Sequence, residues 1–420
     1  MGRKPKESPE IQEENVKNDL MDDFTDDLIK SLNKESGTKV AFNLKNDIDV
    51  STNVKRWIST GSKLLDYIVS NKRDGGLPEG RIIEIFGPPS IGKSHLAIQV
   101  ARHTQKMGGI VVYIDTENAT SIENLTHLGV DISKRFVYVD EHCTEEIFKI
   151  AESTILKAKT MKKDVPVTII WDSVAASSPK AELTADYDKE SMGLQARAIS
   201  KGMRKITGVI GDNNVTFICL NQIRSKLGVL FGDPSTTPGG MAIPFHASVR
   251  IKLGAGQFIE NKNKEPIGIH TRAKIIKNKV SAPFRECEFD ILFGVGIKEH
   301  EQVFDVLREY CEGRENKNEV INGKNITISG TGAWKSLIVS NPKTGEVELE
   351  KKFYKAEFDK ILEDKECEKY CYDLLEYAMV RKNKNNLMEE VYDPDSYEET
   401  RELVNHVSKA DTLDYSSLME

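Results

Sequence analysis

The sequence predicts an α/β fold in which a mostly parallel sheet is flanked by helices, with a small N-terminal arm and a smaller α+β domain at the C-terminal end. Three observations predict this class. Short runs rich in Val and Ile alternate with helical patterns through the centre of the chain, which is typical of a sheet covered on both faces. One of these runs passes directly into a glycine-rich loop and a helical pattern. The length of 420 residues allows one large domain with smaller appendages.

The composition is that of a globular protein. Hydrophobic residues make up 39% of the chain and charged residues 30%, which disfavours disorder of the whole chain. The sequence has no apolar run near the roughly 18 residues that a membrane span needs. Its polar start, MGRKPKESPE, lacks the apolar core of a signal peptide. We therefore expect a cytoplasmic protein with no membrane partner.

The six cysteines are scattered and form no Cys-x-x-Cys pair. Cys367 and Cys371 lie four residues apart in a helix-like stretch, and no His stands close by in the sequence. Because zinc usually takes four ligands, a metal site there is disfavoured, and ordinary reduced thiols are the better interpretation.

The negative charge is concentrated at one end. Residues 387–420 carry ten acidic side chains and two basic ones, a net charge of −8. Because the whole chain carries −7, the remainder sums to +1. This distribution fits a body that binds nucleic acid and has an acidic tail, and it fits equally well a tail that only improves solubility.

Four segments are expected, namely an N-terminal arm (1–54), a core (55–296), a C-terminal α+β domain (297–386) and the acidic tail (387–420). In the arm, apolar residues from Leu20 to Leu32 recur at helical spacing, and an extended stretch, Lys39 to Leu44, follows. Neither piece can form its own core, so each must dock either on a neighbouring subunit or on the body of the chain.

Strand patterns define the core. Seven strands are predicted there, at Arg81–Phe86, Ile110–Asp115, Arg135–Val139, Val167–Asp172, Val215–Asn221, Val249–Leu253 and Ala273–Ile276. After Gly296 the pattern changes to a polar insert, Gly313 to Gly330, and a helix-rich stretch, about Tyr354 to Val380.

The strongest local signal is a phosphate-binding loop, Gly87 to Ser94, which fits G-x-x-x-x-G-K-[ST] between a strand and a helix. Its glycines free backbone N–H groups to surround a phosphate, and the helix N-terminus adds partial positive charge. Lys93 would reach the β and γ phosphates of ATP, and the Ser94 hydroxyl would bind Mg²⁺. The residues expected to bind ATP are Gly87, Pro88, Pro89, Ser90, Ile91, Gly92, Lys93, Ser94 and His95.

Three further strand ends supply groups for the same site. Asp172 ends an apolar strand, and a carboxyl end in such a sheet would place its carboxylate beside the phosphate loop, where it can hold Mg²⁺. Another strand ends in Asp115-Thr-Glu117, and Glu117 is the better candidate to orient an attacking water because it lies further along. A third ends at Gln222, whose amide could sense the γ phosphate.

These elements, in this order, resemble the RecA recombinase family from about Ser59 to Gly296. The matching stretches are STGSKLLD, GGLPEGRIIEIFGP, DSVAASSPKAEL, MGLQARAISKGMRK, NQIRSKLGVLFGDP, TPGG and KNKVSAPF. The resemblance implies a RecA-type P-loop NTPase core. It also implies that Glu117 activates water, that Gln222 couples ATP to DNA, and that Lys277 and Lys279 reach the neighbouring subunit's ATP.

The resemblance also implies two DNA sites. Loops at about Thr184–Ser191 and Ser225–Met241 would face a filament axis. By matching position, the primary site would contain Met192, Arg197, Ser200, Arg204, Arg224, Lys226, Gly239 and Gly240. Arg272 and Lys274 match residues that bind the second duplex. Basic groups and backbone amides suit binding that does not read base sequence.

The chain departs from the family pattern at both ligand sites. Asn124 stands where the family usually has an aromatic side chain that stacks on adenine, and Ser121 replaces an acid near the same base. Pro244 and Met241 replace a lysine at the subunit interface and a DNA-facing Asn. Gly254-Ala255 replaces basic residues of the secondary DNA site.

The leading hypothesis is an ATP-dependent recombinase that forms a helical filament on single-stranded DNA and exchanges strands with a homologous duplex, in a bacterial or phage-infected cell. A ring-shaped helicase or motor of the same fold is the first alternative, and the MGLQAR and TPGG stretches disfavour it. The second alternative is an ATP-switched filament that signals DNA damage with weak strand exchange, which the depleted secondary site keeps open.

Overall fold

The structure is a computed structural model and describes residues 24–44, 53–161, 164–186, 193–225, 235–313 and 319–381. The chain divides into two compact units, Met1–Lys55 and Arg56–Glu420. The acidic segment 387–420 lies outside the described residues.

In the first unit, residues 24–36 form a helix. Phe24, Leu28 and Leu32 are exposed on it, and their spacing of four residues places them on one face. The side chain of Asn33 accepts hydrogen bonds from the backbone N–H groups of Val40 (2.6 Å) and Ala41 (2.8 Å), which holds the following segment against the helix end. The helix predicted from Leu20 to Leu32 is present from residue 24, the first described residue, and continues to residue 36. The extended segment Lys39–Leu44 forms no strand among the described residues.

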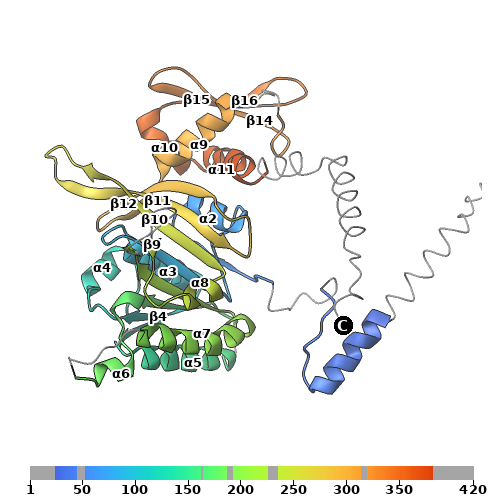
Figure 1. Ribbon diagram of the computed structural model, residues 1–420. Helices are drawn as coiled ribbons and strands as arrows, with labels where there is room; N and C mark the ends of the chain where they lie inside the picture. The colour runs from blue at the N-terminus through green and yellow to red at the C-terminus, as the bar shows by residue number, and fades with distance from the viewer. Residues whose placement is uncertain are drawn as a thin grey trace, which may run out of the picture. The chain divides into compact units, whose positions relative to one another are not determined.

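The second unit is built on a nine-stranded sheet in the order β13-β12-β11-β10-β3-β7-β6-β4-β5 (Figure 1). The strands are β3 (Ile82–Gly87), β4 (Ile110–Asp115), β5 (Phe136–Asp140), β6 (Val167–Asp172), β7 (Val215–Gln222), β10 (Val249–Glu260), β11 (Pro266–Asn278), β12 (Glu286–Leu292) and β13 (Gly296–Lys298). The strands from β10 to β5 in this order are parallel, and β10 to β13 are antiparallel. The predicted α/β class with a mostly parallel sheet is therefore confirmed.

The antiparallel edge differs most from the prediction. The predicted strand Val249–Leu253 continues to Glu260, and Ala273–Ile276 belongs to a strand that begins at Pro266. Together they form a long hairpin. Among the described residues, Val249 to Lys252 of β10 pair with β3, and the outer part of β10 pairs with β11 alone. A strand that leaves its sheet loses the continuous apolar pattern on which the prediction depended.

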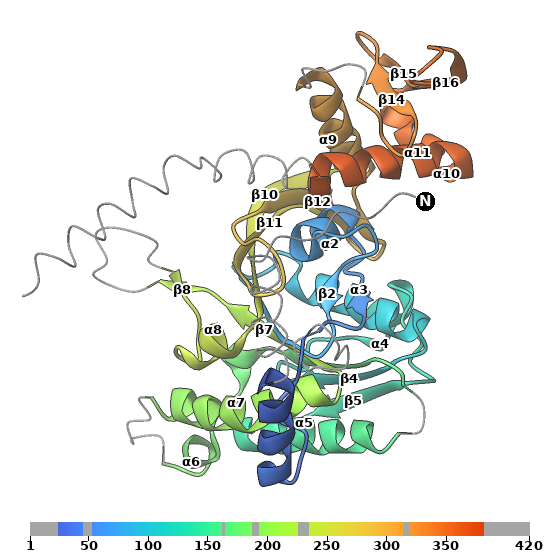
Figure 2. The same cartoon turned by 90° about the vertical axis from the view of Figure 1, so that its right-hand side faces the viewer.

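Helices cover both faces of the sheet (Figures 1 and 2). They are α2 (Lys63–Ser70), α3 (Lys93–Lys106), α4 (Ile122–His127), α5 (Thr144–Lys159), α6 (Lys180–Leu183), α7 (Leu194–Asp212) and α8 (Ala242–His246). Residues of α2 and α3, such as Leu65 and Leu96, share one apolar core with Ile83. Residues of α5 and α7, such as Ile147 and Met203, share another with Phe217. Burial on both faces explains why the parallel strands appear in the sequence as continuous apolar runs.

This part is completed by two short strand pairs and a 3-10 turn. The pairs are β1 (Trp57–Ile58) with β2 (Leu77–Pro78) and β8 (Arg224–Ser225) with β9 (Ser235–Thr236), and the turn is Val174–Ala176.

The last part of the unit is a three-stranded sheet with helices, next to β11 and β12 (Figures 1 and 2). It contains α9 (His300–Gly313), β14 (Asn325–Ser329), β15 (Trp334–Ser340), β16 (Val347–Tyr354), a 3-10 turn (Lys355–Glu357), α10 (Phe358–Glu363), α11 (Lys365–Glu376) and a π-helical turn (Tyr377–Arg381). The segment that we interpreted as a polar insert thus supplies β14. Cys367 and Cys371 are buried in the apolar core of this part.

Candidate functional site

The phosphate loop requires its glycines for steric reasons. Gly92 has a φ of 92°, and a Cβ there would lie 2.2 Å from Cδ1 of Ile291. A Cβ at Gly87 would lie 2.5 Å from the carbonyl oxygen of Leu253. The loop therefore packs tightly between β10 and β12, which fixes it at the carboxyl edge of the sheet.

Lys93 begins α3 and is almost buried. Its ammonium donates hydrogen bonds to the carbonyl oxygens of Gly87 (3.1 Å) and Pro88 (2.6 Å). Burial lowers the pKa of Lys93, and the carboxylates of Asp172 and Glu117 oppose that shift. Among the described residues, no carboxylate forms an ion pair with Lys93, so its charge remains available to an anion in the loop.

Asp172 lies at the end of β6 and is 8% exposed. Its Oδ2 accepts a hydrogen bond from the hydroxyl of Tyr113 at 2.6 Å. Burial raises the pKa of Asp172, and hydrogen bonds from Tyr113 and Ser94 favour its charged form. A carboxylate beside a Ser hydroxyl is a donor set that fits Mg²⁺, which usually takes one or two protein oxygens and completes its shell with water and phosphate.

The two acids that follow β4 have different environments. Asp115 is 1% exposed, and its carboxylate accepts from the backbone N–H groups of Glu117 (3.1 Å) and Thr120 (3.0 Å). It therefore stabilises the loop. Glu117 accepts from Nε2 of Gln222 (3.2 Å) and from the hydroxyl of Ser173, and it lines the pocket.

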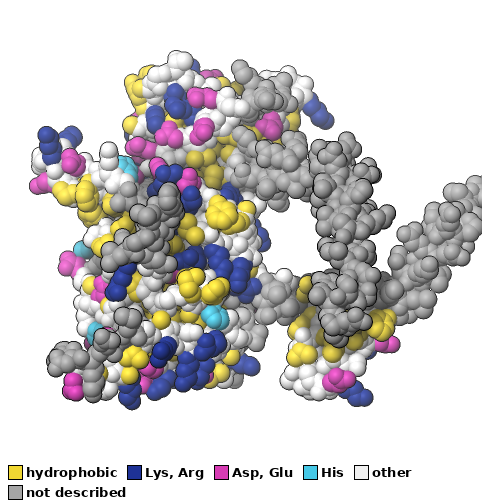
Figure 3. Space-filling model, viewed as in Figure 1, with side chains coloured by type: hydrophobic (Ala, Val, Ile, Leu, Met, Phe, Trp, Pro, Cys, Tyr) yellow, Lys and Arg dark blue, Asp and Glu magenta, His cyan; other side chains and the backbone are white. Residues whose placement is uncertain are grey.

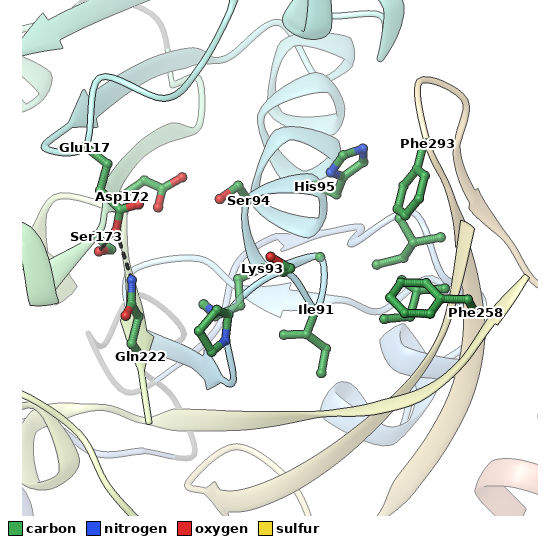
Figure 4. Close-up of a pocket in the computed structure, with 15 residues that line it drawn as sticks. Ile91, Lys93, Ser94, His95, Glu117, Asp172, Ser173, Gln222, Phe258 and Phe293 are labelled. Atoms are coloured by element: carbon green, nitrogen blue, oxygen red, sulfur yellow. Dashed lines mark hydrogen bonds between the residues drawn. The ribbon is translucent and has the colours of Figure 1, made fainter. Parts of the chain in front are cut away.

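The pocket has a volume of about 410 Å³, which is large enough for a small ligand. It joins the phosphate loop from Pro89 to His95 with Glu117, Asp172 and Gln222 (Figure 4). The structure thus brings together the side chains that the sequence placed at three strand ends. Sequence reasoning missed Ser173 and the apolar end of the pocket, which consists of Phe258, Ile269, Ile291 and Phe293.

Lys277 and Lys279 are not among the described residues that line this pocket. Lys277 of β11 lies opposite Arg250 of β10, which in turn lies opposite Glu84 of β3. The ammonium of Lys277 donates to the carbonyl oxygens of Pro244 (2.7 Å) and Phe245 (2.9 Å). Burial lowers the pKa of Lys277, and neighbouring cations act in the same direction.

The predicted primary DNA residues lie on two adjoining elements. Arg197, Ser200 and Arg204 lie on one side of α7, and Arg204 donates to the hydroxyl of Ser200 at 2.8 Å. A Cβ at Gly240 would lie 3.1 Å from Cβ of Ala196, so the loop at Gly239-Gly240 packs against the start of α7. Lys and Arg side chains gather over α7 and beside α8 in Figure 3. Arg224 is exposed in β8, and Met192 and Lys226 lie outside the described residues.

The predicted secondary DNA residues are paired with acids. Arg272 contacts Glu286 (2.7 Å) and Glu288 (3.9 Å), and Lys274 contacts Glu286 (3.9 Å). These acids lie directly opposite on β12, because Arg272 pairs with Glu288 and Lys274 with Glu286 in the ladder. The alternating acids of Glu286-Cys-Glu288 were the signal that sequence reasoning could have used.

No described helix has both the length and the apolar character needed to cross a membrane.

Comparison with known proteins gives one consistent result. A family model described as the RecA N-terminal domain matches residues 24–298. A protein named Protein RecA from Bacteroides thetaiotaomicron is 41% identical over 301 residues, which cover 71% of this chain and 87% of that protein. Protein RecA from Staphylococcus aureus strain JH9 is 36% identical over 341 residues, 81% of this chain and 89% of that protein. Protein RecA from Ruminococcus albus is 44% identical over 248 residues, 59% of this chain, and the match spans 60% of its length.

Proposed function

This chain belongs to the RecA recombinase family, which acts in recombination and repair, and we propose that it does so as a DNA-dependent ATPase that forms a helical filament on single-stranded DNA. The filament then pairs the bound strand with a homologous duplex and exchanges strands. The observation that carries the proposal is the pocket in which Glu117 and Gln222 face the phosphate loop from two different strand ends.

In this proposal each side chain of the pocket has one task. Lys93 and the loop N–H groups bind the β and γ phosphates, while Ser94 and Asp172 hold Mg²⁺. The metal would neutralise charge that develops on the phosphates. Glu117 orients the attacking water, because its environment leaves the carboxylate facing the pocket, whereas Asp115 is held by backbone N–H groups.

Gln222 supports a link between ATP and DNA. Its side chain donates to Glu117, and its backbone leads within two residues to Arg224 of β8. A γ phosphate that attracts the Gln222 amide would break its bond to Glu117 and shift the start of the loop that follows. We infer that this shift brings Arg224 and the loop at Gly239-Gly240 to the DNA strand held along α7.

Lys277 and Lys279 would complete hydrolysis in the neighbouring subunit. Neither lysine is among the described residues that line the pocket of the same chain, which supports a role in trans, and a cation supplied by the neighbour makes hydrolysis depend on assembly. A head-to-tail contact of this kind, repeated without closing, builds a helical filament. We propose that such a filament acts in the cytoplasm of a bacterium or of a phage-infected bacterial cell, and the bacterial sources of the relatives support this location.

The variant Lys93→Ala tests the proposal. It should weaken ADP binding on the order of 100-fold, because a charged hydrogen-bond donor to phosphate is lost from a buried site. It should also form no filaments on single-stranded DNA with a slowly hydrolysed ATP analogue, as seen by electron microscopy. Lys106→Ala, which removes an exposed lysine from the last turn of the same helix, is the matched control. Strand exchange at the wild-type rate by Lys93→Ala would refute the assignment.

One observation favours a second candidate, a filament with restrained strand exchange. Arg272 and Lys274, the cations expected to capture the second duplex, are both paired with Glu286. Strong single-strand binding and ATP hydrolysis with little capture of homologous duplex would support this candidate over efficient exchange.

A further inference from the structure

The pocket beside the phosphate loop has two chemically different ends. One end contains Lys93, Ser94, Glu117, Asp172 and Gln222 and suits phosphate and Mg²⁺. The other end is lined by Ile91, Phe258, Ile269, Ile291 and Phe293, and it is apolar and aromatic. A nucleotide has the same two-part chemistry, since a charged phosphate chain is joined to a flat ring system.

The apolar end is a row of side chains that crosses three strands. Phe258 of β10 lies opposite Ile269 of β11, and Ile269 lies opposite Ile291 of β12. Side chains at directly opposed positions point to the same face of a sheet. Ile269 and Ile291 are buried next to the phosphate loop. Phe258 lies in the same row, further from the loop, and also lines the pocket.

A β-bulge puts Phe258 in this row. The ladder shifts between Ala255 and Phe258, where two residues of β10 oppose His270 alone. In a regular ladder Gln257 would oppose Ile269, and Phe258 would face away from the phosphate loop. The bulge therefore turns an aromatic side chain toward the pocket, where it remains 62% exposed. A large exposed apolar side chain beside a pocket is a feature that a ligand can explain.

Two further rings lie near Phe258. Phe293, in the turn after β12, is 46% exposed and lies close to Phe258 in Figure 4, with His95 of α3 beside it. Nε2 of His95 is buried and has no hydrogen-bond partner among the described residues. His95 lines the pocket, and a buried nitrogen without a partner is a group for which a ligand can supply the missing hydrogen bond.

Helix α4 supplies none of the described lining residues. Ser121 forms the N-cap of α4, and its hydroxyl accepts from the backbone N–H of Asn124 at 3.1 Å. Neither residue lines the pocket among the residues described. The α4 side therefore offers this chain no aromatic face for a nucleobase.

We propose that Phe258 is the principal base-binding residue of this chain, and that it holds the nucleobase together with Phe293 and His95. The long hairpin thus takes over the stacking that α4 does not provide. Stacking on Phe258 and Phe293 fixes the ring plane, and Nε2 of His95 forms a polar contact with the base or the sugar. The proposal rests on the ATP binding proposed above and assigns the part of the site that holds the base.

The test compares two probes on the full-length protein by titration calorimetry, Mg²⁺-ADP and inorganic tripolyphosphate. Phe258→Ala should weaken ADP binding by about tenfold, the effect of one lost stacking face, and leave tripolyphosphate binding unchanged. Phe258→Tyr should bind ADP as the wild type does, because the aromatic face is kept. His95→Phe keeps a ring but removes the nitrogen, and it should weaken ADP binding by about fivefold, as for one hydrogen bond.

Ile267→Ala is the control, because it trims an exposed apolar side chain of the same hairpin that does not line the pocket, and it should bind both probes normally. Unchanged ADP affinity in Phe258→Ala would overturn the base-binding role. An equal loss for ADP and tripolyphosphate would overturn it too, since that result indicates damage to the phosphate loop. If the wild type binds tripolyphosphate as tightly as ADP, the base is not held and the inference fails while the phosphate site stands. Binding of neither probe by the wild type would reject the ATP-binding proposal itself.

Discussion

The two faces of strands β10 to β12 carry different kinds of side chain, apolar residues on one face and paired charges on the other. On the inner face, Phe258, Ile269 and Ile291 form an apolar floor beside the phosphate loop. The nearby Lys93 donates hydrogen bonds to carbonyl oxygens. On the outer face, Arg272 and Lys274 are paired with carboxylates of β12. Alternate residues of the same strands thus line a ligand pocket and a surface of paired charges.

This difference shows how pairing sets the availability of a charge. A lysine that contacts neutral carbonyl groups keeps its full charge for a phosphate. A cation that already contacts a carboxylate must exchange that partner for a DNA phosphate, and the exchange gains little in water. Four changes would break or sharpen the comparison.

The largest effect is expected on the inner side, from Glu117→Gln. ATP hydrolysis should fall by about 100- to 10,000-fold, since a positioned base contributes that range, while Mg²⁺-ADP affinity stays close to that of the wild type. Steady-state hydrolysis with single-stranded DNA and calorimetry with ADP measure the two quantities. Glu123→Gln removes an exposed acid from α4 and should hydrolyse ATP normally. A fully active Glu117→Gln would exclude Glu117 as the base.

The next effect concerns the close packing of the phosphate loop. Gly92→Ala should weaken ADP binding by roughly 10- to 100-fold, because it combines a left-handed backbone with a contact to Cδ1 of Ile291. Adding Ile291→Val removes that atom and should recover part of the loss, leaving the backbone strain. ADP titration measures both variants. Complete recovery of ADP affinity in the double variant would show that the contact with Ile291, and not the left-handed backbone, is the reason for glycine at position 92.

On the outer face, the double variant Glu286→Gln/Glu288→Gln should raise affinity for duplex DNA by about fivefold at low salt, because it frees two cations. The gain should fade as salt rises, since exposed charges are screened. Fluorescence anisotropy with labelled duplex measures the affinity. Glu123→Gln/Glu363→Gln removes the same charge from exposed helix positions and is the control. An equal gain in the control would mean that only net charge matters.

The smallest effect is a pH dependence of the metal site. Burial raises the pKa of Asp172, so this carboxyl group takes up a proton at a higher pH than an ordinary Asp does. Protons compete with Mg²⁺ for the carboxylate, and Mg²⁺-ADP affinity should therefore fall modestly as the pH is lowered below neutrality. Calorimetry at stepped pH measures the fall. In Asp172→Asn the Mg²⁺-dependent part of binding should be weak and independent of pH over the same range. The same pH dependence in both proteins would locate the titrating group elsewhere.

Much of the fold could be predicted because the parallel strands are buried on both faces. The bounds of β4 and β6 agree with the apolar runs Ile110–Asp115 and Val167–Asp172. The prediction was poorer where one face of a strand meets solvent, as in the outer part of β10 and in β12. The segment Lys39–Leu44 forms no strand among the described residues, because an extended segment becomes a strand only when another chain segment pairs with it.

The sequence by itself determined the phosphate end of the pocket. The motif spacing predicted the loop from Gly87 to Ser94. The ends of the apolar runs predicted that Glu117, Asp172 and Gln222 lie near this loop, because the carboxyl ends of parallel strands lie at one edge of the sheet. Only the tertiary structure decided the other features. The register of β11 against β12 pairs Arg272 with Glu288, and a bulge in β10 turns Phe258 toward the pocket. Register and bulges depend on which residues oppose each other across strands, and that information lies in pairs of positions far apart in the chain.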